Sequence, residues 1–277
     1  MSILYFDCFS GISGDMTIGS LIDAGADASH LKEELKKLKI ENEYELKWTT
    51  VNKNGITSTK FDVILQEENH SHEEGQSHGE DVVEHTHTHH DGSHSHEHHH
   101  HHHGHHHHEH RTYKDIVRMI EESGLEEGVK ATALRIFTKI GEAEGKIHGQ
   151  PLDQVHFHEV GAVDSIIDIV GTAILIHQLG VETIVCSPIP VGGGKIHIDH
   201  GIYPVPAPAT LEILRGVPIM TSNIKGELTT PTGAAIAAVL AEDYGAMPSM
   251  EIKEIGYGAG SKTFKNHPNV LRTVIGK

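Results

Sequence analysis

The chain has few of the features that stabilise a protein covalently or carry it across a membrane. Only two of its 277 residues are cysteine, Cys8 and Cys186, and neither belongs to a Cys-x-x-Cys pair. This excludes a disulfide framework and a thiolate zinc site. The first residues lack a basic region and include Asp7, so we predict no secretory signal. No apolar run approaches the ~20 residues of a membrane helix. We therefore expect a soluble, cytoplasmic protein without a membrane partner.

Basic residues are also scarce. The sequence has 22 Lys and Arg against 39 Asp and Glu, a formal net charge of −17. Non-specific binding to nucleic acid needs a basic surface, so nucleic acid is excluded as a partner. The shortage is most severe from Phe61 to His110, a stretch of 50 residues with no Lys or Arg, 20 His and 11 Asp or Glu.

This His-rich stretch predicts metal binding, because imidazole nitrogens suit nickel, zinc and copper better than magnesium or calcium. An affinity tag would be a uniform run at a terminus, whereas this tract is internal and mixed with acidic and small residues. The other alternative is a solvated insert with no role. Because its composition alone would bind metal in vitro, metal affinity does not distinguish this alternative from a functional metal site. The candidate ligands are His85, His87, His89, His90, His94, His96, His98, His99, His100, His101, His102, His103, His105, His106, His107, His108 and His110.

Alternating helix and strand patterns on both sides of this tract predict an α/β (or α+β) fold, a layered mixed sheet with helices. Residues 1–66 are expected to form a strand-helix-hairpin part of the core, 67–110 a disordered His-rich metal-binding insert, and 111–277 the remainder of the core. Asn54-Gly55 is a strong hairpin signal. Helices are predicted over Val129–Ala143, Val163–Leu179, Pro208–Arg215 and Pro231–Tyr244, and strands over Ile3–Phe6, Tyr44–Thr50, Thr57–Leu65, Thr183–Cys186, Glu251–Tyr257 and Val270–Ile275.

The segment from Asp7 to Asp15 is the first candidate site. Its small residues lie between a predicted strand and a predicted helix, where backbone N–H groups can converge on an anion and carboxylates can reach a metal. Ordinary turn and capping interactions are the alternative. The candidate binding residues are Asp7, Ser10, Ser13 and Asp15.

The segment from His156 to Asp168 is more specific. In an extended chain His156 and His158 point to one side, and on a helix Asp164 and Asp168 share a face. The surrounding helix is apolar, so the two carboxylates are expected to be desolvated and to need a cation. Together with Glu159 these residues suit a nickel, zinc or manganese site. Helix capping would explain Asp164 but not Asp168.

Two further segments could bind an anionic ligand. Gly192–Gly194 allow a close approach, with Lys195 beside them as a cation, although a surface turn is the alternative. Thr229, Thr230 and Thr232 open a predicted helix, where hydroxyls and free N–H groups could receive a phosphate. A simple threonine cap explains part of that pattern.

Several motifs follow one another along nearly the whole chain. They are Asp7-Cys-Phe-Ser-Gly-Ile-Ser-Gly-Asp-Met16, the His-rich insert, Phe157-His-Glu-Val-Gly-Ala-Val-Asp164, His200-Gly-Ile-Tyr-Pro-Val-Pro-Ala-Pro-Ala-Thr210, Gly226-Glu-Leu-Thr-Thr-Pro-Thr-Gly-Ala-Ala235, Gly256-Tyr-Gly-Ala-Gly260 and Asn269-Val-Leu-Arg272. In this order they resemble the LarC family, the nickel insertion proteins of nickel-pincer cofactor biosynthesis.

The resemblance implies an enzyme, a nickel chelatase or cyclometallase of the lyase class. It would insert Ni²⁺ into pyridinium-3,5-bisthiocarboxylic acid mononucleotide, using CTP with Mn²⁺ or Mg²⁺, and the His-rich insert would be its nickel reservoir. Family members usually continue into a further domain associated with CTP binding, and some are encoded as two pieces. The resemblance therefore implies a separately encoded C-terminal portion as a candidate partner that activity would require. We also expect a homo-oligomer.

The resemblance also suggests roles for the candidate residues. Asp164, Asp168, His158 and Glu159 would be catalytic, because they would hold nickel in transit or supply the base that accepts a displaced ring proton. His156 and His158 would be metal ligands. The residues expected to face the nucleotide, its phosphate and the counter-ion are Asp7, Ser10, Ser13, Asp15, Lys195, Thr229, Thr230 and Thr232.

Two other functions fit the sequence. One is a non-catalytic nickel storage protein or metallochaperone, and the other is a metal-dependent phosphohydrolase that uses the Asp-rich loops. The His-rich tract favours nickel insertion or storage, because a hydrolase needs no metal reservoir.

Deletion of residues 70–110 separates insertion from storage. A nickel-inserting enzyme supplied with ample Ni²⁺ should keep its turnover, whereas a storage protein should lose its function. The measurement is the rate of nickel incorporation at saturating Ni²⁺. Loss of turnover in a deletion variant that folds normally would contradict the reservoir role.

Overall fold

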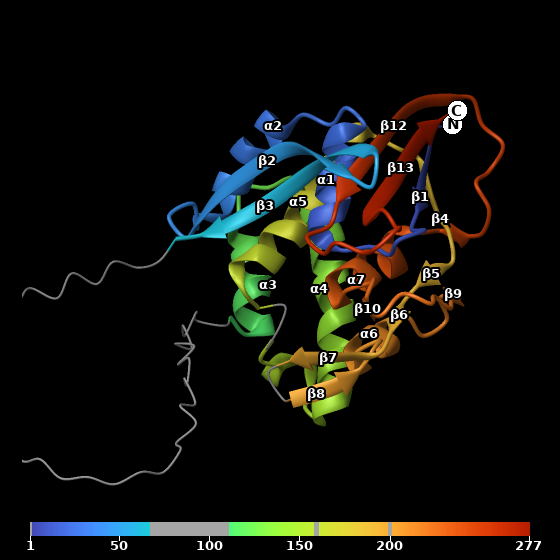
Figure 1. The fold of residues 1–277 in the computed structure, drawn as a ribbon. Coiled ribbons are helices and arrows are strands. Elements are labelled where there is room, and N and C mark those ends of the chain that lie inside the picture. The colour runs from blue at the N-terminus through green and yellow to red at the C-terminus, as the bar shows by residue number, and fades with distance from the viewer. Residues whose placement is uncertain (1, 67–110, 158–160, 199–200) are drawn as a thin grey trace, which may run out of the picture. The chain divides into compact units, whose positions relative to one another are not determined.

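The computed structural model describes residues 2–66, 111–157, 161–198 and 201–277 (Figure 1). These belong to one compact unit, made of residues 1–66 and 109–277. The metal-ligand candidates from His85 to His110 lie outside the described residues, as do His158 and Glu159.

A seven-stranded mixed sheet forms the framework of this unit. In sheet order its strands are β11 (Asp243–Tyr244), β4 (Thr183–Cys186), β1 (Ile3–Asp7), β13 (Val270–Gly276), β12 (Ile252–Ala259), β3 (Ile56–Leu65) and β2 (Tyr44–Lys53). Strands β11, β4 and β1 are parallel, and β13 runs antiparallel to both β1 and β12. Strand β3 is parallel to β12 and forms a hairpin with β2. The predicted layered mixed sheet with helices is confirmed.

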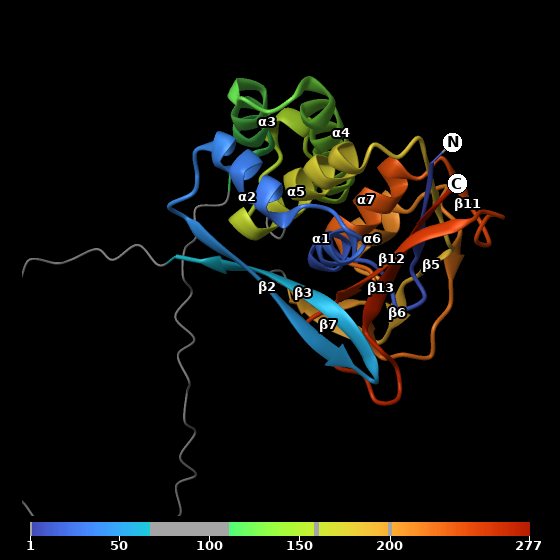
Figure 2. The same cartoon turned by 90° about the horizontal axis from the view of Figure 1, so that it is seen from above.

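The helices build a second layer on this sheet (Figure 2). They are α1 (Gly14–Asp23), α2 (Ala28–Leu35), α3 (Tyr113–Glu122), α4 (Glu127–His148), α5 (Val163–Leu179), α6 (Pro208–Ile213) and α7 (Pro231–Leu240), with short 3-10 helices at Lys36–Leu38 and Leu152–Gln154. Helix α1 lies directly on β12, β3 and β13, α5 packs on α1, and α4 packs on α5. None of the helices in the described ranges combines the length and apolar character needed to cross a bilayer.

Three pairs of short strands lie outside the main sheet. They are β5 (Ile189–Pro190) with β9 (Ile219–Met220), β6 (Gly192–Gly193) with β10 (Gly226–Glu227), and β7 (Lys195–Ile198) with β8 (Gly201–Pro204). Strand β7 also packs against β10, so the β6–β10 and β7–β8 pairs are neighbours.

Local sequence signals account for several element boundaries. Thr112 and Asp115 form a reciprocal capping box at the start of α3. Asn54 and Gly55 both have positive φ, as the tight β2–β3 turn requires. The helix predicted from Pro231 to Tyr244 is too long, however. It ends at Leu240, because the following residues pair with β4 as strand β11.

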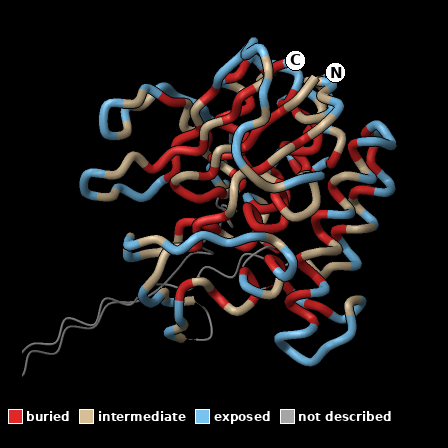
Figure 3. Tube along the Cα trace, turned by 90° about the vertical axis from the view of Figure 1, so that its right-hand side faces the viewer, coloured by how far each residue is buried: buried red, intermediate tan, exposed pale blue. Residues whose placement is uncertain are grey.

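Buried residues of the sheet and of the helices form one hydrophobic core, and Figure 3 marks their positions along the chain in red. Helix α1 approaches β12 so closely that a Cβ atom at Gly258 would overlap the carbonyl oxygen of Met16, and one at Gly256 would overlap that of Ser20. Glycine at these two positions therefore sets the distance between α1 and the sheet, and with it the position of the loop that precedes α1.

The substitution Gly258→Ala should destabilise the protein by about 1–3 kcal/mol or more, because α1 must move away from the sheet to make room for the methyl group. Gly245→Ala is the matched control, since a Cβ there meets nothing within 4 Å. Urea unfolding of the two variants would measure the difference, and equal stabilities would contradict the packing argument.

Candidate functional site

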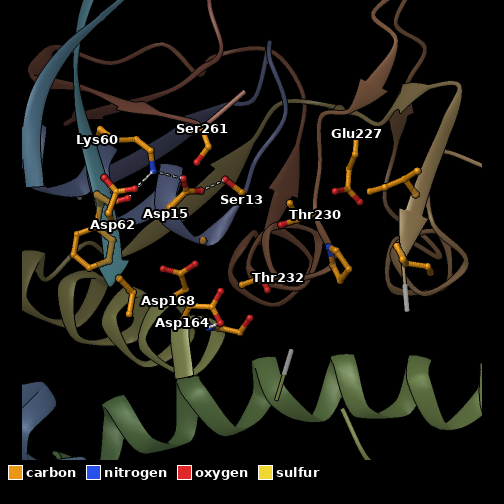
Figure 4. Close-up of a pocket in the computed structure, with 17 residues that line it drawn as sticks. Ser13, Asp15, Lys60, Asp62, Asp164, Asp168, Glu227, Thr230, Thr232 and Ser261 are labelled. Carbon is orange, nitrogen blue, oxygen red and sulfur yellow. Dashed lines mark hydrogen bonds and ion pairs between the residues drawn. The ribbon is translucent and has the colours of Figure 1, made fainter. Parts of the chain in front are cut away.

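A cavity of about 450 Å³ lies where the N-termini of three helices converge (Figure 4). These helices are α1, α5 and α7, and residues from the first turns of each line the cavity. Free N–H groups and the helix dipole make such termini favourable places for anions. The lining residues are Ser13, Gly14, Asp15, Lys60, Phe61, Asp62, Val63, Asp164, Ser165, Asp168, Ile196, Ile198, Glu227, Thr230, Pro231, Thr232 and Ser261.

Lys60 is the centre of an ion-pair cluster on one side of the cavity. Its Nζ lies 2.9 Å from Asp15 Oδ2 and 2.8 Å from Asp62 Oδ1, and it also donates to the carbonyl oxygen of Phe61. Only 13% of the Lys60 side chain is exposed. Burial alone would lower the pKa of Lys60, but the two carboxylates outweigh this effect and raise it. The ammonium is therefore firmly charged, and it holds the two carboxylates in place.

Asp168 lies on the other side of Asp15, against the start of α1. Gly14 allows this contact, because any Cβ at that position would overlap the Asp168 carboxyl group. The Oδ1 atom of Asp168 is enclosed and has no hydrogen-bond partner. Burial raises the pKa of Asp168 well above its usual range, and the charges of Asp15 and Asp164 raise it further, against a smaller opposing effect of Lys60.

The cavity is strongly acidic. Among its lining residues within the described ranges, five are carboxylates and Lys60 is the one cation. This imbalance and the unpartnered oxygen of Asp168 favour binding of a cation. In the described part of the chain no group of three or more His, Cys, Asp or Glu side chains could hold a metal ion. An ion bound beside Asp168 would thus complete its coordination with solvent or substrate atoms.

Six of the predicted site residues come together in this cavity, although they belong to three separate segments of the chain. Ser13 and Asp15 are hydrogen-bonded to each other at the start of α1, and Thr230 caps α7 by accepting from the Gly233 N–H. The six residues are Ser13, Asp15, Asp164, Asp168, Thr230 and Thr232.

Other predicted residues lie outside the cavity lining. Asp7 accepts a hydrogen bond of 2.9 Å from Arg272 Nε on the neighbouring strand. Ser10 is buried with its Oγ 2.9 Å from His267 Nε2, and Thr229 is buried and donates to the carbonyl oxygen of Pro190. These three side chains thus have partners within the fold.

The remaining described candidates are exposed. Lys195 is exposed on β7, and His156 is exposed where it bridges to Thr112. Neither is among the residues that line the cavity.

Five polar lining residues were not among the predicted site residues, namely Lys60, Asp62, Ser165, Glu227 and Ser261. Lys60 and Asp62 alternate along β3 and so point to the same side, a pattern that the sequence does contain. Glu227 stands in the motif that precedes α7. Its side chain is only 9% exposed, and burial raises its pKa although Lys262 Nζ lies 3.8 Å away.

A family model described as "Nickel insertion protein" matches residues 4–277. The chain belongs to the nickel insertion protein family. A pyridinium-3,5-bisthiocarboxylic acid mononucleotide nickel insertion protein of Geobacillus kaustophilus is 51% identical over 280 residues, which cover 100% of this chain and 60% of that protein. The protein of the same name from Clostridium kluyveri is 48% identical over 277 residues, 100% of this chain and 62% of its own length.

A putative nickel insertion protein of Dictyoglomus thermophilum is 43% identical over 277 residues, covering 100% of this chain and 61% of the relative. The chain thus spans about three fifths of the length of the curated relatives of the nickel insertion family that it matches. No solved structure matches it.

The raised pKa of Asp168 predicts how this member of the nickel insertion family responds to pH. Because the folded chain holds the Asp168 proton more tightly than the unfolded chain, folding stability should fall as the pH rises above about 4. In the absence of metal, Asp168→Asn should therefore be more stable than the wild type at neutral pH, and the difference should vanish near about pH 3. Thermal unfolding across this range would measure it.

Asp153→Asn is the matched control, because Asp153 is exposed and lies outside the cavity. Its stability relative to the wild type should not change with pH in the same way. A wild type that is more stable than Asp168→Asn at neutral pH would contradict the electrostatic description of the cavity.

Proposed function

We propose that the cavity of this chain holds Ni²⁺ during its insertion into pyridinium-3,5-bisthiocarboxylic acid mononucleotide. The names of the relatives support this reaction. Because the chain spans about three fifths of their length, the activity of the complete protein is part of the proposal. The main observation that supports the proposal is that the carboxyl group of Asp168 is enclosed in an acidic cavity and that one of its oxygens has no hydrogen-bond partner.

Asp164 and Asp168 are the proposed holders of nickel in transit, with solvent or substrate atoms completing the coordination of the ion. Burial and the charges of Asp15 and Asp164 raise the pKa of Asp168, and a divalent cation would replace its proton. Such a site binds its metal loosely, as a site that must pass the metal on requires.

The helix termini are the proposed binding place for the phosphate of the mononucleotide. The Thr230 Oγ accepts a hydrogen bond of 3.1 Å from the Gly233 N–H, so its own hydrogen remains available to donate to an anion. Thr232 lines the same cavity and offers a further hydroxyl group. These two residues would bind the phosphate without adding a positive charge that repels nickel.

Insertion that joins nickel to a ring carbon displaces a proton, which needs an acceptor. Asp168 is the proposed acceptor once nickel has passed from it to the substrate, because its raised pKa makes its carboxylate a stronger base than an exposed one.

The remaining features implied by the family resemblance belong to this proposal as well. They are the lyase class, the use of CTP with Mn²⁺ or Mg²⁺, and a separately encoded C-terminal portion. Carboxylate oxygens, which the cavity supplies, are the ligands that Mn²⁺ and Mg²⁺ prefer. Asp15 and Asp62 would hold such an ion, and the greater length of the relatives is consistent with a further portion.

Alanine at both Asp164 and Asp168 should reduce nickel insertion by at least about 100-fold, because both carboxylates that face the metal from α5 are lost. The assay would use the chain together with any separately encoded portion, and would follow the nickel-bound nucleotide by mass spectrometry. Asp153→Ala is the control and should keep full activity. Normal turnover of the double variant would remove these residues from the site, whereas a pure storage protein would show no turnover in any form.

A further inference from the structure

Strand β7 presents two different faces. Successive side chains of a strand point to opposite sides, and in β7 the half-buried Ile196 and Ile198 line the cavity. Lys195 and His197 alternate with them, are exposed and are not part of the lining. The cavity therefore has an aliphatic wall on this strand, which the acidic cluster does not explain.

The aliphatic wall adjoins a single buried carboxylate. Glu227 lies on β10, which packs beside β7, and Figure 4 shows it across the cavity from Lys60 and Asp15. Its side chain is 9% exposed and forms a long ion pair, because Lys262 Nζ lies 3.8 Å from Oε2 and donates instead to the backbone carbonyl oxygen of Glu227 at 3.3 Å. An aliphatic surface beside an incompletely paired carboxylate is suited to a flat, positively charged group.

The proposed substrate contains such a group, because a pyridinium ring is planar and carries a positive charge. We propose that Ile196, Ile198 and Glu227 form the subsite for the pyridinium ring of the mononucleotide. The ring would pack on the two isoleucines, with its charge compensated by Glu227. This inference rests on the proposed function, and it assigns the opposite side of the cavity, at Asp15 and Asp168, to the metal.

In this arrangement the isoleucines and Glu227 bind the substrate, and the metal lies beside α1 and α5. The cavity volume of about 450 Å³ lies within the range found for small-molecule pockets, about 300–1,000 Å³. With the ring on β7, the substituents of the ring would extend toward the carboxylates that hold nickel. The three residues therefore affect substrate affinity more than they affect the chemical step.

The test is the affinity of the complete chain for the mononucleotide in the absence of nickel, measured by titration calorimetry. Replacing both isoleucines by alanine should weaken binding about 10-fold or more, because the ring loses its apolar support. Ile202→Ala is the matched control. Ile202 is 69% exposed on β8 and pairs with His197, on the face turned away from the cavity, so its loss should change the affinity less than about twofold.

Conservative variants separate a binding role from a folding defect. Replacing both isoleucines by leucine should restore most of the affinity, because volume and apolar character are kept. Glu227→Gln should weaken binding of the pyridinium mononucleotide several-fold but leave binding of its neutral dihydropyridine counterpart unchanged. In the chain combined with any separately encoded portion, Glu227→Gln should raise the KM for the mononucleotide while kcat stays nearly constant.

Two outcomes would overturn the inference. If the alanine and glutamine variants bind the mononucleotide as tightly as the wild type, the subsite is elsewhere, and the proposed function stands. If the wild-type chain does not bind the mononucleotide at all, both the subsite and the proposed function fail.

Discussion

The contact between Gly14 and the Asp168 carboxyl group is the constraint on which the site depends. It brings the start of α1 against α5 and encloses one oxygen of Asp168 without giving it a partner. A carboxylate in this position is stable only when a proton or a cation compensates its charge. The glycines of β12 support the same arrangement from the other side, because they let α1 lie close to the sheet.

Two sources of positive charge lie beside the acidic groups of the cavity. Lys60 supplies a full charge to Asp15 and Asp62, and the N-termini of α1, α5 and α7 supply partial charges. Neither gives the Oδ1 atom of Asp168 a hydrogen-bond partner. In the proposed function the cavity would accept a divalent cation and an anionic nucleotide together, since each offsets the charge of the other.

Much of the fold could be predicted from local signals. The capping box at Thr112, the Asn54-Gly55 turn and the apolar pattern of α5 each fix an element through interactions between near neighbours in sequence. The overlong helix before Tyr244 shows the limit of such signals. Its last residues pair with β4, a partner more than fifty residues earlier that the local sequence does not reveal.

The sequence by itself determined the family motifs, the pairing of Asp164 with Asp168 on one helix face, and the placement of small residues at helix starts, because these depend on short spacings. Only the tertiary structure decided which segments share the cavity. It brought Lys60 and Glu227 to the site and gave Asp7, Ser10 and Thr229 partners elsewhere in the fold. The physical reason is that sheet order and helix packing, which join distant segments, determine where each side chain finds its partner.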